Sequence, residues 1–187
     1  MNTDCQSSPL RECDDRDELG SSAEGDVPPE RTDRPAPHTM ELSLDRGPLT
    51  ADRGTLLEQR LRAVASLLPR PVARINVRIV QDGDMATLHQ QWHDAPTTTD
   101  VMTFEHADEG PLEVDLVLCS DQADREADGR PHAADEELLL YAVHGLLHCC
   151  GFDDHTEAEA SAMHAEEDRL LKQIGLGPIF ASREDDR

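Results

Sequence analysis

The sequence predicts an α+β fold in which one small mixed β-sheet of about four strands packs with about five helices. Two observations support this prediction. From Met40 onward, apolar residues recur alternately with the period of two that is typical of strands and the period of 3.6 that is typical of helices. Strands are also mixed with helices along the chain, an order that favours one mixed sheet in an α+β layer. The length of 187 residues suits one such domain with room for a tail.

The first part of the domain is predicted to form a strand at 40–44, a helix at 55–68, a strand at 73–80 and a helix at 84–92. The apolar residues of the first helix form one stripe, and Pro69 and Pro71 end it. In the second strand, isoleucine and valine alternate with arginine and asparagine, which indicates a strand with one buried face.

The second part is predicted to contain strands at 100–104 and 112–119 and helices at 121–127, 133–150 and 157–174. An acidic turn separates the two strands, and Gly175 ends the last helix. The functional interpretation depends on the histidines of the helix at 133–150.

Residues 1–38 differ in composition from the rest of the chain. They contain ten acidic residues and four arginines, with prolines, serines and scarcely any large apolar side chains. Such a segment buries too little apolar surface to offset the entropy cost of ordering it. We therefore expect a disordered acidic tail at 1–38, a folded domain at 39–178 and a flexible C-terminal tail at 179–187.

Residues 1–38 lack the apolar stretch of about 7–15 residues that a signal peptide needs. No run anywhere in the chain reaches the roughly 18 apolar residues of a membrane span. We therefore expect a cytoplasmic protein with no membrane partner. The five cysteines are odd in number, and Cys5 and Cys13 lie in the predicted tail, so we expect no disulfide framework.

The most informative pattern is a pair of histidines, His144 and His148, in the helix at 133–150. Residues four apart lie on one face of a helix, so the two imidazoles can bind one divalent metal ion. Gly151 allows a left-handed helix stop that turns the chain back and delivers a third ligand. Three protein ligands leave a coordination position open, as in catalytic zinc sites. The alternative is a buried amphipathic helix whose histidines make hydrogen bonds in the core.

The residue after the first histidine argues against one class of enzyme. Zinc peptidases with this histidine spacing carry a glutamate there as general base. This chain has Gly145 instead, so a peptidase would lack its proton acceptor.

The net charge of −23 opposes nucleic-acid binding, because phosphate binding needs clustered positive charge. Residues 53–80, however, carry a net charge of +5, since their one acid, Glu58, stands against six arginines: Arg53, Arg60, Arg62, Arg70, Arg74 and Arg78. Two interpretations stay open at this point. These arginines either border a basic groove for RNA phosphates or form a solvated surface.

The run from His144 to His155 resembles the hallmark of the YbeY family of single-strand endoribonucleases, His-Gly-x-Leu-His-x-x-Gly-(Tyr/Phe)-Asp-His. The third histidine of the family corresponds to Asp154, and the histidine of this chain comes one residue later, at His155. Either side chain can bind zinc. Counting residues from His148 as in the family places Asp154 at the position of the third ligand. Keeping an imidazole as the third ligand requires His155 and a turn that is longer by one residue. We favour Asp154.

Two further segments resemble the family. Trp92 and the run Thr99-Asp100-Val101 match its second signature, with Phe104 after them, and Asp115 matches an aspartate in a later strand. His93 stands where the family has arginine, a residue that the resemblance assigns to RNA contact or charge stabilisation. A histidine does this only when protonated; alternatively, His93 simply ends a helix in solvent.

The resemblance implies an endoribonuclease with one zinc ion per chain, in which Asp153 either orients a ligating imidazole or caps the turn. It also implies single-stranded RNA as substrate, notably the 3′ end of 16S ribosomal RNA during maturation and ribosome quality control. The small ribosomal subunit would then be a partner, and DNA would not. Two alternatives remain: a metal-dependent hydrolase of another substrate such as a peptide, and a non-catalytic ribosome assembly factor stabilised by zinc.

Overall fold

The computed structural model describes residues 40–107, 109–177 and 179. The predicted acidic tail at 1–38 therefore lies outside the described residues, as do residues 180–187 of the predicted C-terminal tail. Ile179, which we placed in that tail, is buried. Its backbone N–H donates a hydrogen bond of 2.8 Å to the Asp168 carboxylate.

Four strands form one mixed sheet in the order β1-β2-β4-β3, which confirms the predicted sheet. The strands are β1 (Glu41–Asp45), β2 (Val72–Val80), β3 (Val101–Glu105) and β4 (Leu112–Cys119). The pairs β1–β2 and β2–β4 are parallel, whereas β3 and β4 are antiparallel neighbours. The strand β3 consequently forms one edge of the sheet.

Five helices accompany the sheet, as predicted: α1 (Ala51–Ala65), α2 (Asp82–His93), α3 (Ser120–Ala127), α4 (Ala134–Cys149) and α5 (Glu157–Gln173). The largest shift from the predicted boundaries is at α1, which begins four residues before the predicted 55. Thr50 explains this start, because its side-chain oxygen accepts a hydrogen bond from the Arg53 N–H, a typical N-cap.

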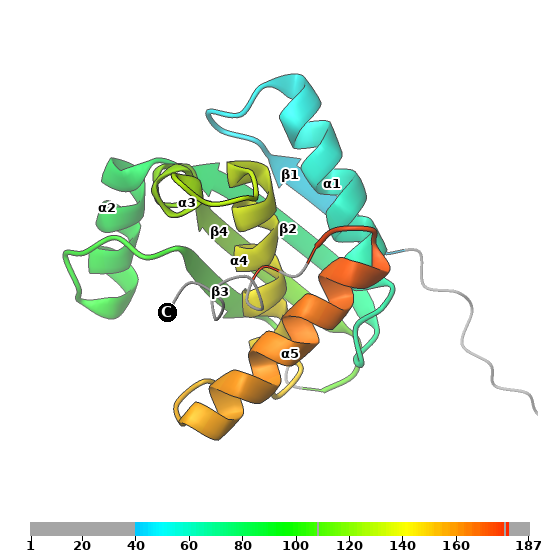
Figure 1. The fold of residues 1–187 in the computed structure, drawn as a ribbon. Coiled ribbons are helices and arrows are strands. Elements are labelled where there is room, and N and C mark those ends of the chain that lie inside the picture. The colour runs from blue at the N-terminus through cyan, green and yellow to red at the C-terminus, as the bar shows by residue number, and fades with distance from the viewer. Residues whose placement is uncertain (1–39, 108, 178, 180–187) are drawn as a thin grey trace, which may run out of the picture. The chain divides into compact units, whose positions relative to one another are not determined.

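The two faces of the sheet bury different clusters. The larger cluster joins the inward side chains of β2 and β4 to α1, α4 and α5, and Figure 1 shows α4 running across the sheet with α5 beside its end. The helix α2 packs a smaller cluster, made by Val80, Met85, Met102 and Cys119. Met102 alternates along β3 with Val101 and Thr103, which lie under α4. The small cluster therefore lies on the opposite face of the sheet.

The central helix α4 is apolar nearly all round and is therefore buried along most of its length. Its two histidines are only partly buried, so the C-terminal turns of α4 bring them from the core toward solvent. No described helix combines the length and the apolar character that crossing a membrane requires.

Candidate metal centre

The last turns of α4 bring the two predicted histidines together. Nε2 of His144 lies 3.1 Å from Nε2 of His148, and the two rings meet edge to face with their centroids 4.6 Å apart. The spacing of four residues produces this contact, because it stacks the side chains on one helix face.

The turn after α4 returns the chain to these histidines. Gly151 has φ +88°, and its N–H donates to the His148 carbonyl over 2.9 Å. The Phe152 N–H donates to the Leu147 carbonyl over 3.1 Å, which completes a Schellman stop. Three residues after the glycine, Oδ2 of Asp154 lies 3.8 Å from Nε2 of His144.

The donor atoms of His144, His148 and Asp154 all lie within 4.8 Å of one another. Two ligands placed about 2.0–2.1 Å from one tetrahedral ion stand about 3.3 Å apart, which is close to the 3.1 Å between the two Nε2 atoms. Two imidazoles and one carboxylate are the kind of set found in catalytic zinc sites, where a fourth position stays open. The residues present therefore fit a divalent metal ion.

Each imidazole is oriented by a hydrogen bond at its other nitrogen. Nδ1 of His144 lies 2.9 Å from Oε1 of Glu167, and Nδ1 of His148 lies 3.1 Å from the Phe152 carbonyl. An ionised carboxylate and a carbonyl only accept hydrogen bonds, so both Nδ1 atoms donate. When the rings are neutral, both Nε2 atoms carry the lone pair that a metal ligand needs.

Glu167 comes from α5 and is fully buried. Its second oxygen, Oε2, has no hydrogen-bond partner among the described residues. A buried charge without full pairing costs free energy, which a nearby cation offsets. At the start of α5, Thr156 and Glu159 form a reciprocal capping box, which fixes the direction of the helix that carries Glu167.

The electrostatics of the site favour a positive charge at His144. Burial acts to lower the pKa of His144, but the carboxylate of Glu167, followed by those of Asp100 and Asp154, outweighs burial and raises this pKa above its ordinary value. The same carboxylates favour a bound metal cation in place of the proton.

Among the described residues, the other predicted site residues make their hydrogen bonds and ring contacts with partners other than the histidine pair, although His155 Nδ1 also lies 3.7 Å from Oδ1 of Asp154. The side chain of His155 is 80% exposed, and its Nδ1 lies 2.5 Å from Oδ1 of Asp153. Asp153 also accepts the Asp154 N–H over 2.8 Å, a hydrogen bond that lowers the pKa of Asp153 and fixes the turn. Asp153 thus holds the turn, whereas Glu167 and the Phe152 carbonyl orient the imidazoles. His93 ends α2 in solvent, with its ring centroid 5.3 Å from that of His89.

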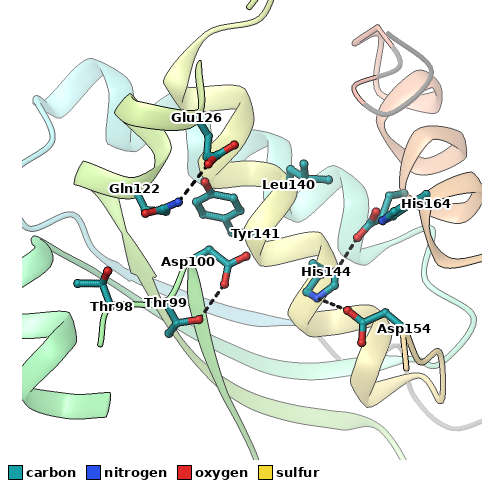
Figure 2. A pocket seen from close by; sticks show the side chains of 11 residues that line it. Thr98, Thr99, Asp100, Gln122, Glu126, Leu140, Tyr141, His144, Asp154 and His164 are labelled. Atoms are coloured by element: carbon teal, nitrogen blue, oxygen red, sulfur yellow. Dashed lines mark hydrogen bonds and ion pairs between the residues drawn. The ribbon is translucent and has the colours of Figure 1, made fainter. Parts of the chain in front are cut away.

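A cavity of about 360 Å³ opens beside His144 and Asp154. Figure 2 shows side chains around it from the segment just before β3, from α3, from α4 and the turn after it, and from α5. Apart from His144, Asp154 and Glu167, its lining consists of Thr98, Thr99, Asp100, Gln122, Glu126, Leu140, Tyr141 and His164.

Sequence reasoning missed Glu167 and His164, although one signal was present. Met163, Glu167, Leu170 and Leu171 lie on one stripe of α5, and all four are buried. A carboxylate within an apolar stripe indicates a buried partner, because burying an unpaired charge is costly.

Gly145 is where α4 comes closest to β3. A Cβ atom at this position would lie 2.4 Å from Oγ1 of Thr103 and 3.1 Å from Cδ2 of Leu116. The position therefore faces the sheet at contact distance, and a glutamate side chain has no room there. The close packing of α4 on β3 therefore explains why this position does not carry the glutamate that serves peptidases as general base.

Each of the six arginines of residues 53–80 has a carboxylate partner, which favours the second of the two interpretations, a solvated surface, over a groove of free positive charge. The pairs are Arg53–Asp135 at 2.7 Å, Arg60–Glu136 at 4.0 Å, Arg62–Glu58 at 2.8 Å, Arg70–Glu105 at 2.6 Å, Arg74–Glu113 at 3.1 Å and Arg78–Asp45 at 3.9 Å. All partners except Glu58 come from outside residues 53–80. The folded chain therefore neutralises the charge that the segment shows in isolation.

The fold and the site together define a small α+β protein whose donor set is of the kind that metal-dependent hydrolases carry. The family model described as Endoribonuclease YbeY matches residues 50–175, and the chain belongs to this family. The Endoribonuclease YbeY of Methylibium petroleiphilum is 32% identical over 148 residues, which are 79% of this chain and 99% of the relative. That of Micrococcus luteus is 33% identical over 140 residues, which are 70% of this chain and 89% of the relative.

One solved structure supports the fold. The solution structure of TM1509 from Thermotoga maritima superposes with a TM-score of 0.54 at 22% identity, covering 72% of this chain and 89% of that protein. This likeness bears on the fold alone.

Proposed function

We propose that this chain is a zinc-dependent endoribonuclease that cleaves single-stranded RNA, with one zinc ion held by His144, His148 and Asp154. The observation that carries the proposal is the set of three donors within 4.8 Å beside an open cavity, in a chain of the Endoribonuclease YbeY family. A zinc ion there would supply Lewis acidity toward a phosphate oxygen and lower the pKa of a water molecule to about 7.

The chain's own residues orient the donors and handle protons. Glu167 and the Phe152 carbonyl hold the imidazoles so that their two Nε2 atoms face each other, and His144 lines the cavity. Asp100 also lines the cavity, and its Oδ1 accepts the Val101 N–H over 2.8 Å and the Thr99 hydroxyl over 3.0 Å. These hydrogen bonds fix the carboxylate, so we assign its other oxygen, Oδ2, to accepting a proton released in the cavity.

We infer that the substrate is the 3′ end of 16S ribosomal RNA, in maturation and in ribosome quality control, that the small ribosomal subunit is the partner and that the protein acts in the cytoplasm. The support is the resemblance of the motifs together with the names of the relatives. A peptidase is disfavoured by the packing of Gly145 against β3. A purely structural zinc site ordinarily uses four protein ligands, whereas the group of donors around the histidine pair has three members among the described residues.

The first experiment measures zinc and cleavage in the same preparations. Protein purified without chelator should carry close to one zinc per chain and cut a single-stranded RNA, while a duplex of the same sequence and a peptide library stay intact. His148→Ala should lose both zinc and cleavage but keep its helical circular dichroism. A folded protein that binds no zinc even after reconstitution would refute the metal site, and zinc without RNA cleavage would leave the assembly-factor alternative.

The second experiment compares the two candidates for the third ligand. Asp154→Ala should weaken zinc binding by at least the roughly 10- to 100-fold typical of losing an outer partner. His155→Ala is the comparison variant and should weaken zinc binding less than Asp154→Ala does, because the His155 side chain is 80% exposed and its Nδ1 lies 2.5 Å from Oδ1 of Asp153 and 3.7 Å from Oδ1 of Asp154. The opposite result would assign the ligand to His155.

A further inference from the structure

Trp92 is an exposed aromatic side chain that is nevertheless held in place. It is 60% exposed, and the only other exposed large apolar side chain among the described residues is Leu56, at 40%. Its indole meets the ring of Phe104 edge to face, with the centroids 5.4 Å apart. One edge of the indole is therefore fixed, while much of the ring stays open to solvent.

The chain connects Trp92 closely to the candidate metal centre. Trp92 lies in the last turn of α2, and Thr98, six residues later, lines the cavity. Six residues span at most about 20 Å. The His89 ring shortens the connection further, since its Nδ1 lies 2.7 Å from the Thr97 carbonyl and ties this segment to α2.

The strand β3 provides a second connection. Phe104, which supports Trp92, alternates along β3 with Thr103, which lies under Gly145 of the metal-bearing helix. Neighbouring side chains of a strand point to opposite faces, so Trp92 and the metal centre lie on the two sides of β3. Because β3 is an edge strand, a single polynucleotide strand that crosses this edge reaches both.

The charges of the protein favour a contact that does not depend on phosphate. The chain carries a net charge of −23, and the arginines of residues 53–80 are all ion-paired. Stacking of a base on an aromatic ring does not require a cation, tolerates any sequence and is available only where bases are unpaired.

We propose that the Trp92 indole, supported by Phe104, stacks on one unpaired base of the RNA strand, a few nucleotides from the bond placed at the metal centre. The proposal rests on the proposed function, and it makes Trp92 a residue that selects single-stranded over duplex substrate. Stacking of this kind contributes about 1–3 kcal/mol per base, which corresponds to about 5- to 150-fold in affinity.

Trp92 is the only tryptophan of the chain, so intrinsic fluorescence reports on it directly. Zinc-loaded protein is mixed rapidly with single-stranded RNA, and the emission is recorded before turnover. We expect saturable quenching by the single strand, with little change on raising the salt concentration, and none by a duplex. Replacing one nucleotide at a time with an abasic unit should abolish the quenching at one position only. Equal quenching by duplex, or none by the single strand, would overturn the proposal.

Substitutions test the same contact through cleavage. Trp92→Leu keeps apolar bulk but removes the aromatic face, so KM should rise about 5- to 150-fold with zinc content and kcat nearly unchanged, while Trp92→Phe should recover most of the loss. Leu56→Ala, at the other exposed apolar side chain, is the control and should behave as wild type. An unchanged KM in Trp92→Leu would refute the stacking contact. If the wild type cleaves no RNA, the proposed function fails, and quenching by the single strand still supports stacking.

Discussion

Replacing Gly145 with alanine adds one methyl group where α4 lies closest to β3. The new Cβ would lie 2.4 Å from Oγ1 of Thr103, 3.1 Å from Cδ2 of Leu116 and 3.4 Å from Cγ2 of Val101. Overpacking of a core costs about 1–3 kcal/mol, and the higher helix propensity of alanine offsets about 1 kcal/mol. The difference is a net loss of about 0–2 kcal/mol in the free energy of unfolding. Because Thr103 is β-branched and stiff, we expect a value in the upper half of this range.

Urea unfolding of Gly145→Ala, alone and together with Thr103→Ala, measures this cost. The alanine at 103 removes the nearest atom, so the cost of Gly145→Ala should be smaller in that background, which gives a measurable coupling energy. Gly83→Ala is the matched control, since Gly83 also lies in a helix but a Cβ there meets nothing within 4 Å. Equal costs in both backgrounds, or a Gly145→Ala as harmless as the control, would refute the packing argument.

Three other predictions concern the surroundings of the site. Glu167→Gln weakens the acceptor for His144 Nδ1, so chelator competition should show a loss of zinc affinity of about 10- to 100-fold; unchanged affinity would contradict its orienting role. Arg70 donates hydrogen bonds to four acceptors: the Glu105 carboxylate and the carbonyls of Ala107, Gly110 and Cys149. Arg70→Ala should therefore lower the free energy of unfolding in urea by about 2–4 kcal/mol. The exposed Arg78→Ala is the control and should lower it by less than about 0.5 kcal/mol. Burial raises the pKa of the Cys119 thiol from 9.0 to about 11. Between pH 9 and 11 the folded chain therefore keeps a proton that the unfolded chain loses, so the free energy of unfolding should fall as the pH rises through this range. The fall should be smaller in Cys119→Ala.

The helices and strands were predictable because the pattern of apolar residues within each segment indicates its type. In β2 and β4, apolar side chains alternate with polar ones, and this pattern alone specifies a strand with one face toward the core. The start of α1 was misplaced because the apolar stripe begins at Leu57, whereas the helix begins after the Thr50 cap. Capping is a polar signal that the apolar pattern does not contain.

The site was predictable only where it is local in sequence. His144 and His148 share one helix, and Gly151 governs one turn, so spacing and backbone chemistry suffice to place them together. Glu167 lies 23 residues from its partner His144, and their contact depends on the angle at which α5 crosses α4. The ion pairs of residues 53–80 were not predictable for the same reason, since their carboxylates come from distant segments such as β4 and α4.

The distribution of charge connects the two proposed contacts with RNA. The cavity is lined by four carboxylates, those of Asp100, Glu126, Asp154 and Glu167, which repel a phosphate unless a cation lies among them. A metal ion bound as proposed would therefore be the main attraction for phosphate in the cavity, while stacking at Trp92 needs no cation. Removing the metal should then abolish cleavage and weaken binding, yet single-stranded RNA should still quench the Trp92 emission at higher concentration. If metal removal abolishes the quenching at every RNA concentration, Trp92 is not an independent contact.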